Sequence, residues 1–240
     1  MLEFPKRDPL MYAGFEQLIL RGTAEVLENG PRGCFLRDRL GGAYILAAET
    51  TELSLAWLEA HDPSRMRLLE VFDPALVRYM RDRYGADNLL RCRQARWYGP
   101  APEATGDLDI APAVPSDFGV IRPLYNKMTD AELMAVIHRS ELFLGRTRGE
   151  ICGFIGWHPE GSIGLLEVLP GYRRRGFGAA LERFLIGETL RKGWIPFAQI
   201  ETGNEASLRL QTSLGMHISR GSLYWVFRDI PNEKEGETVR

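Results

Sequence analysis

Hydrophobic and polar positions follow two periods along this chain, and each change of period marks the end of a helix or a strand. In the first hundred residues, apolar side chains at helical spacing predict a helix over residues 10–27, ended by Asn29-Gly30-Pro31. Residues 51–61 fit either period. The other expected elements are a hairpin of residues 34–37 and 43–47 about Gly41-Gly42, a helix over 74–84, and strands at 67–72 and 89–98.

A run of small residues and prolines at positions 99–107 indicates a linker. We therefore expect an α+β domain over residues 1–105, a second domain over 106–232, and a flexible, mostly charged tail over 233–240. In the second domain Thr129 and Glu132 form a capping box that opens a helix. The elements expected there are strands at 108–113 and 195–202, helices at 116–127, 129–139 and 204–214, and hairpins of 142–146 with 151–157 and within 218–227.

The most informative stretch is the strand-loop-helix segment over residues 165–193. Its strand is stopped by Pro170, and its helix carries Leu181 and Leu185 on one face, with Glu182 on another. The loop between them holds three arginines and two glycines: Arg173, Arg174, Arg175, Gly176 and Gly178. Helix N-terminal amides attract anions, and glycine lets phosphate oxygens approach them. Three arginines suit a ligand with more than one phosphate.

Two common phosphate motifs do not fit this loop. A P-loop requires Gly-Lys followed by Ser or Thr, whereas Gly176 is followed by Phe177-Gly178-Ala179, which excludes it. The dinucleotide-binding fingerprint requires a third glycine where Leu181 stands and normally lacks a basic run, which argues against it.

The remaining pattern, Arg173-x-x-Gly176-x-Gly178 after a strand, resembles the acyl-CoA motif of the GCN5-related N-acetyltransferases. Asn204 to Met216 resembles the second signature of that family, Asn-x-x-Ser/Ala…Leu-Gly-Phe. More narrowly, the chain is similar to the branch that includes the glycine N-acyltransferase-like proteins. The resemblance implies acetyl-CoA as co-substrate and an amine on a small molecule or peptide as acceptor. The residues implied to bind the cofactor are Val168, Arg173, Arg174, Arg175, Gly176, Phe177, Gly178, Ala179, Asn204 and Ser207.

The resemblance also implies the fold of residues 106–232. This is an α+β fold with a mixed, mainly antiparallel central sheet flanked by helices, and the predicted order of elements agrees with it. The first half mixes helices and strands but has no arginine-glycine loop. It is a candidate for a degenerate copy of the same fold.

Candidate acid-base residues are few. Glu167 is a charged residue in an apolar strand, so we expect it to face a cleft and order the water that deprotonates the acceptor. Glu201 has a similar, weaker claim as a second catalytic carboxylate. Gln211 stands where the family often has a tyrosine that protonates the leaving thiolate, and glutamine cannot act as an acid. Water, Tyr172 or Tyr224 are the alternatives.

Composition narrows the remaining functions. A net charge of −2 gives no global attraction to nucleic acid. The three cysteines are scattered, and neither they nor the histidines form a metal motif. The N-terminus lacks the apolar core of a signal peptide and no run is long enough to span a membrane, so we expect a cytoplasmic protein. The sequence leaves the oligomeric state open. Two alternatives to an enzyme are a CoA-binding regulatory protein with impaired catalysis and a nucleotide-binding regulatory module.

Overall fold

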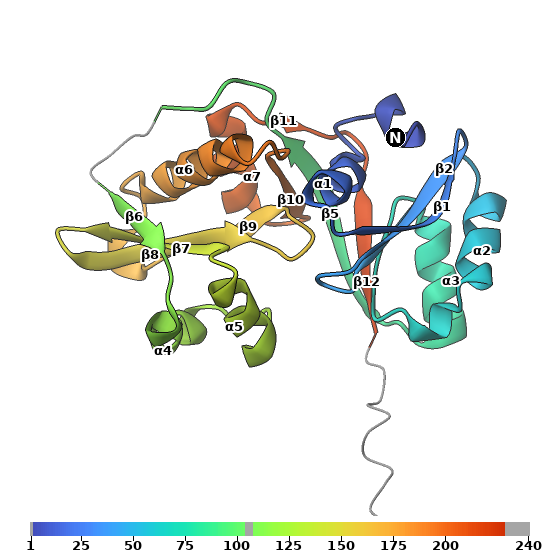
Figure 1. Ribbon diagram of the computed structural model, residues 1–240, viewed down its shortest axis with the longest axis horizontal. Coiled ribbons are helices and arrows are strands. Elements are labelled where there is room, and N and C mark those ends of the chain that lie inside the picture. Colours follow the sequence, from blue (N-terminus) through green and yellow to red (C-terminus); the bar gives the residue numbers. More distant parts are fainter. Residues whose placement is uncertain (1, 104–107, 229–240) are drawn as a thin grey trace, which may run out of the picture.

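The computed structural model describes residues 2–103 and 108–228, and the strands of that part of the chain form one sheet (Figure 1). The strand order is β1-β2-β3-β4-β12-β5-β10-β9-β8-β7-β6, with β11 paired to β5. Two neighbouring pairs, β3 with β4 and β9 with β10, are parallel, and the other pairs are antiparallel. The strands are β1 (Ala24–Gly30), β2 (Gly33–Asp38), β3 (Tyr44–Ala48), β4 (Leu68–Val71), β5 (Asn88–Arg96), β6 (Asp109–Pro112), β7 (Leu142–Thr147), β8 (Glu150–Trp157), β9 (Ile163–Val168), β10 (Phe197–Glu201), β11 (His217–Ile218) and β12 (Leu223–Phe227).

Helices cover both faces of the sheet, which confirms the predicted α+β class. On one face α2, α3 and α6 pack on the sheet through two apolar clusters, and α7 lies beside α6. On the other face α1 packs near β2 and β3, and α5 packs near β7 and β8. The helices are α1 (Ala13–Arg21), α2 (Thr51–Ala60), α3 (Pro74–Tyr84), α4 (Phe118–Ile121), α5 (Asp130–His138), α6 (Phe177–Arg191) and α7 (Glu205–Leu214).

The two parts of the chain exchange strands at the centre of the sheet. Strand β12, from the end of the chain, lies between β4 and β5, and β5 lies between β12 and β10. Strand β4 is therefore completed by the second part, and β10 by the first. This continuity runs across the predicted boundary at residues 105 and 106, which falls outside the described residues, as does the predicted tail. The division into two domains stays a prediction.

The connection order of the first part resembles that of the second. In β1-β2-β3-α2-β4-α3, two antiparallel pairs are followed by a parallel pair that a helix joins. The segment β7-β8-β9-α6-β10-α7 has the same order and the same parallel pair around α6.

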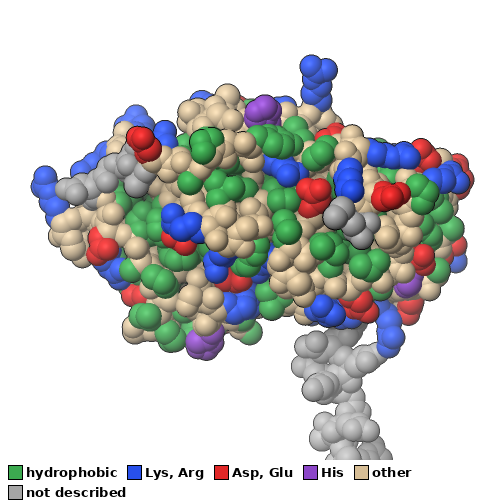
Figure 2. All heavy atoms as spheres, turned by 45° about the horizontal axis from the view of Figure 1, so that its top comes forward, with side chains coloured by type: hydrophobic (Ala, Val, Ile, Leu, Met, Phe, Trp, Pro, Cys, Tyr) green, Lys and Arg blue, Asp and Glu red, His purple; other side chains and the backbone are tan. Residues whose placement is uncertain are grey.

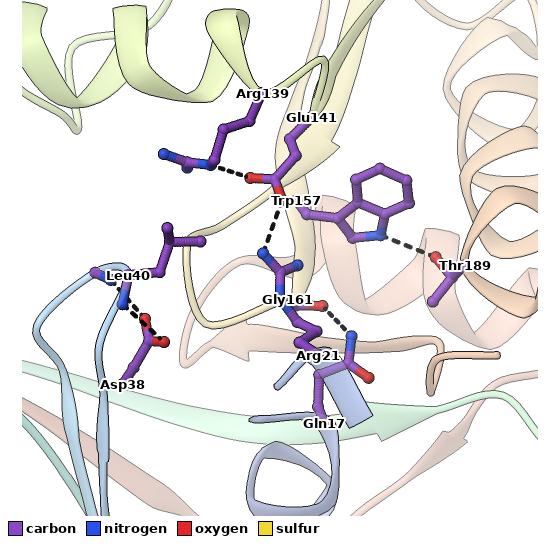
Figure 3. A network of polar contacts seen from close by, with 10 residues as sticks. Gln17, Arg21, Asp38, Leu40, Arg139, Glu141, Trp157, Gly161 and Thr189 are labelled. Atoms are coloured by element: carbon purple, nitrogen blue, oxygen red, sulfur yellow. Dashed lines mark hydrogen bonds and ion pairs between the residues drawn. The ribbon is translucent and has the colours of Figure 1, made fainter. Parts of the chain in front are cut away.

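Helix α1 fastens the first part to the second (Figure 3). Gln17 donates a hydrogen bond to the carbonyl of Gly161, at 3.2 Å, and accepts one from the amide of Ile195. Arg21 forms a buried ion pair with Glu141 at 2.8 Å and stacks on the ring of Trp194. Since buried charges must be paired to be tolerated, these contacts fix α1 against the β8–β9 loop, the residue before β7 and the segment between α6 and β10.

Three elements differ from those predicted. The first helix ends at Arg21 because Gly22 adopts the left-handed conformation, with φ of 71°, and residues that continued its period form β1. The helix over 116–127 is broken, because Pro123 follows α4 and residues 122–124 form a 3₁₀ turn. The last hairpin is wrong, since β11 and β12 both pair with β5.

Candidate acyl-CoA site

The site is built around the end of β9, where the sheet opens. Parallel strands β9 and β10 are paired in register at one position, Ile163 with Ala198, and separate beyond it. A bulge in β9 accompanies this separation: the register with β8 shifts, and Leu165 adopts a left-handed φ of 49°. Bulges bend a strand and increase its twist. We call the resulting opening the β9–β10 gap.

The backbone amide of Val168 points into this gap. The amide of Leu169 donates to the carbonyl of Cys152 on β8, at 2.9 Å. Amides of successive residues in a strand point to opposite edges, so the amide of Val168 points away from β8 and towards β10. Because β10 has separated there, this donor is available to a ligand.

The loop after β9 forms a cradle for anions. Arg174 and Gly176 adopt left-handed conformations, with φ of 60° and 84°, which turns backbone amides inward as in anion-binding nests. The amides of Phe177, Gly178 and Ala179 open helix α6 and have no acceptor within it, whereas Ala180 already bonds to Gly176. A Cβ placed at Gly171 or Gly176 would meet no atom within 4 Å. The loop therefore fits phosphate groups.

The three predicted arginines have different surroundings. Arg173 bonds through Nη2 to Glu167, at 2.8 Å, and through Nε to the carbonyl of Val168, at 2.9 Å. Arg175 lies over the rings of Tyr172 and Phe177, at 5.4 and 5.2 Å from their centroids. The side chain of Arg174 is exposed. Arg174 and Arg175 are thus the better placed cations for a ligand, while Arg173 braces the end of β9.

Helix α7 brings the second signature to the same site. Asn204 caps this helix, since its side chain accepts from the amide of Ser207 at 3.0 Å, as its residue type predicts. A Cβ at Gly178 would lie 3.6 Å from Val168 and 4.0 Å from Leu210. The first turn of α6, the end of β9 and helix α7 therefore converge at Gly178.

The position of the expected tyrosine is part of a buried pair between α6 and α7. Gln211 donates a hydrogen bond to Glu182, at 3.0 Å, and both side chains are buried. Burial raises the pKa of Glu182 to about 7. Of the alternative acids, Tyr172 donates to Glu150, which raises the pKa of its hydroxyl, and Tyr224 packs into the α2–α3 core.

The two predicted catalytic carboxylates lie on neighbouring strands, on the face that α5 covers. Glu167 is in register with Phe154, which packs against α5, and its carboxylate is held by Arg173. Glu201 is the last residue of β10 and lies 3.7 Å from Lys127, which follows α4.

An open pocket of about 350 Å³ lies at Glu201. It forms because β5 and β12 extend beyond the end of β10, so the first residues of β5 and the last residue of β12 make a wall there. Its lining combines one ion pair and one amide with apolar side chains: Asn88, Leu89, Leu90, Lys127, Glu201 and Phe227. We call it the Glu201 pocket.

Sequence reasoning missed two members of this region. Lys127 was expected at the end of a predicted helix and carries no motif, so only the fold brings it to Glu201. Glu182 was expected on the polar side of its helix, but it is 1% exposed and faces α7.

Known proteins with similar structures share this fold. The chain has a TM-score of 0.63 to a Drosophila protein, with 14% identity over 82% of this chain and 73% of that one. A putative acetyltransferase of the GNAT family from Novosphingobium aromaticivorans gives a TM-score of 0.56, with 17% identity over 90% of this chain and 97% of that one. A GCN5-related N-acetyltransferase from Kribbella flavida also gives a TM-score of 0.56, with 13% identity over 92% of this chain and 95% of that one. The chain therefore has the fold of the GCN5-related N-acetyltransferases.

The comparison of the sequence with protein-family models matches a shorter part of the chain than the structural comparisons do. A family model described as FR47-like protein matches residues 142–226, a segment that runs from β7 to β12 and contains the whole β9–β10 gap. No curated protein matches the sequence.

Three further observations on the described residues concern metal ions, membranes and surface charge. Among residues 2–103 and 108–228, no group of His, Cys, Asp or Glu side chains could hold a metal ion. No helix in that part of the chain has the length and apolarity needed to cross a membrane. On the face drawn in Figure 2, acidic and basic side chains are interspersed.

Proposed function

We propose that the protein is an N-acyltransferase that moves an acyl group, most simply acetyl, from acyl-CoA to an amine. The observation that carries this proposal is the β9–β10 gap, which opens beside the anion-binding start of α6. A ligand with a pyrophosphate at one end and a reactive thioester at the other fits a site with those two features side by side.

Each part of the site has a role in this proposal. The first amides of α6, with Arg174 and Arg175, bind the phosphates, and each charge-assisted bond contributes about 1.5–3 kcal/mol before the cost of ordering the ligand. Asn204 and Ser207 flank the arm that leads to the thioester. The amide of Val168 donates to the thioester oxygen, where negative charge develops as the amine attacks.

The acceptor is proposed to enter through the Glu201 pocket, with its amine towards the β9–β10 gap. An amine with a pKa near 10.4 must lose a proton before attack, which costs about 5 kcal/mol at pH 7. A carboxylate that orders a proton-accepting water lowers this cost. Glu201 lines the pocket and its pair with Lys127 is long, at 3.7 Å, whereas Arg173 holds Glu167 at 2.8 Å, so we favour Glu201 for this work and keep Glu167 as a second candidate.

We further propose that residues 1–105 are a degenerate copy of the catalytic half and that the chain belongs with the glycine N-acyltransferase-like branch. The repeated connection order around α2 and α6 supports the first proposal. The second proposal, membership of that branch, is supported by the order of the two halves, because a divergent half precedes the proposed catalytic half in this chain.

Calorimetric titration of the protein with acetyl-CoA, CoA, ADP and NAD tests the ligand, and thiol release with a panel of amines tests the reaction. We expect CoA to bind more tightly than ADP or NAD. Gly178→Trp should weaken CoA binding at least tenfold, because the indole would fill the space between β9 and α7. Gly119→Trp on α4, in open space, is the matched control.

Unchanged CoA affinity in Gly178→Trp would remove the loop from the site. Equal affinity for CoA, ADP and NAD would favour the nucleotide-binding module. Tight CoA binding without thiol release would favour the regulatory protein that has lost catalysis.

A further inference from the structure

A buried carboxyl group lies between helices α6 and α7, and the charged side chains nearby do not account for its state. Glu182 is 1% exposed, and its pKa is raised to about 7 by burial and lowered in part by the hydrogen bond from Gln211. Arg183 and Glu188 on α6, and Arg209 on α7, are not among the causes of this shift. A desolvated carboxyl with one amide partner favours its neutral form.

The partner amide indicates the same protonation state. Gln211 donates through Nε2 to one oxygen of Glu182, but its own Oε1 is buried and accepts no hydrogen bond from any described residue. A buried acceptor without a donor costs about 1–3 kcal/mol. A protonated Glu182 carries an O–H that can satisfy Oε1, which completes a two-bond pair between acid and amide.

The pair lies above the β9–β10 gap. Helix α6 packs on β7, β8 and β9: a Cβ at Gly145 or Gly153 would come within 3.2 Å of Leu181, and one at Gly178 would contact Val168. Helix α7 follows β10 directly, and its C-terminal end lies near Trp97, which follows β5. The facing sides of α6 and α7, where Glu182 and Gln211 meet, therefore cover the opening between β9 and β10.

We propose that Glu182 supplies the proton that the leaving thiolate needs, and that Gln211 is the positioning residue that orients it. This inference rests on the proposed acyl transfer and names the acid of that reaction. It assigns a chemical role to the buried pair at the position where the sequence has no tyrosine.

The amine nitrogen forms a bond to the thioester carbon, and the carbon–sulfur bond breaks with its electron pair passing to sulfur. The Glu182 O–H proton passes to sulfur, which gives the thiol and leaves a carboxylate. The proton lost by the amine passes to water ordered near Glu201, and solvent reprotonates Glu182 after the products leave.

Glu182→Gln tests the proposal, with Glu188→Gln on the same helix as control. Glutamine keeps the size of the side chain and a hydrogen bond to Gln211 but has no acidic proton. We expect CoA affinity within about twofold of wild type and a kcat lower by a factor of about 10² or more, the range usual for loss of a general acid. The wild-type fall in kcat above pH 7 should disappear in Glu182→Gln.

Gln211→Met provides a second variant. It removes both hydrogen bonds of the pair, the one that Gln211 donates and the one that the Glu182 O–H donates, so the high-pH limb of the kcat profile should move away from its wild-type position. A merely structural pair would change the melting temperature and leave the pH profile in place, which would overturn the proposal.

A readout without turnover separates this inference from the proposed function. The thiolate of bound CoA absorbs in the ultraviolet, so its titration gives the thiol pKa in the complex. The ionised Glu182 carboxylate should raise that pKa, and Glu182→Gln should lower it by about half a unit or more. Equal values in both proteins would overturn the role of Glu182, whereas failure of wild type to bind CoA would overturn the acyl-CoA site and this role together.

Discussion

Replacing Glu70 by glutamine should make the stability of this protein less dependent on pH. Glu70 lies on β4, is fully buried, and accepts a hydrogen bond from Gln199 of β10 at 3.2 Å. Its second oxygen has no hydrogen-bond partner among the described residues. Burial, with a smaller contribution from Glu160, raises the pKa of Glu70 to about 8 from its ordinary 4.5, against the opposing effect of Gln199. The folded protein therefore holds this carboxyl neutral.

The sign and size of the effect follow from these two values. The folded state binds the proton more tightly than the unfolded state, so the stabilisation is complete below pH 4.5 and is lost as the pH rises through 8. The values differ by about 3.5, and each unit corresponds to about 1.36 kcal/mol. Ionisation of Glu70 in the unfolded state, while the folded state keeps it neutral, should therefore lower the free energy of unfolding by about 5 kcal/mol between pH 4.5 and 8. Glutamine at this position makes no such contribution.

Urea unfolding of wild type and Glu70→Gln at each pH from 5 to 9 measures this difference. Subtracting the two free energies cancels the other titrating groups, Glu182 included, since both proteins contain them. The free energy of unfolding of Glu70→Gln, relative to that of the wild type, should rise by several kcal/mol from pH 5 to 9. Glu52→Gln, which changes an exposed side chain, should show the same pH dependence as the wild type. A difference that stays constant with pH would show that Glu70 does not titrate between the two states.

Two further predictions concern the proposed catalytic carboxylates and the strand exchange. Glu201→Gln should lower kcat by a factor of about 10²–10⁴ with CoA affinity unchanged, and Glu167→Gln should lower kcat by a smaller factor. Measurement of kcat against pH for both variants tests this, and a larger fall in Glu167→Gln than in Glu201→Gln would make Glu167 the base. Cutting the chain after residue 105 should give two fragments that unfold without cooperativity, because β4 then lacks β12 and β10 lacks β5. Mixing them should restore a cooperative transition by circular dichroism, and cooperative unfolding of either fragment alone would contradict this.

Local signals were sufficient to predict the elements around the anion-binding loop. The hairpin of β7 and β8, the capping box of Thr129 with Glu132, and the Asn204 cap are all present as expected. Each depends on residues within a few positions of one another, so its energy is determined before the rest of the chain is placed. The α+β class followed from these elements in order.

Long-range pairing could not be predicted in the same way. The continuous apolar run of β12, Leu223 to Phe227, fits any neighbouring strand, and nothing in its residues distinguishes β4 from β11 as a partner. In the first helix, Val26 and Leu27 continue the helical period, and only the position of Gly22 marks the end. Glu182 was assigned to a polar face because a lone helix cannot reveal that α7 covers it.

The strand exchange explains why the first half can lack the arginine-glycine loop and still matter to the site. Strand β5 supplies Leu90 to the Glu201 pocket, and β12, held between β4 and β5, supplies Phe227. Behind this wall Trp225 lies in register between Glu70 and Leu90, and its indole donates to Gln199, which also bonds to Glu70. One connected row thus joins the buried carboxyl of the first half to the wall of the proposed acceptor pocket. Because neutral Glu70 helps to hold this row, an acceptor-binding step that depends on the wall should weaken as the pH rises through 8, even where the phosphate loop binds CoA unchanged.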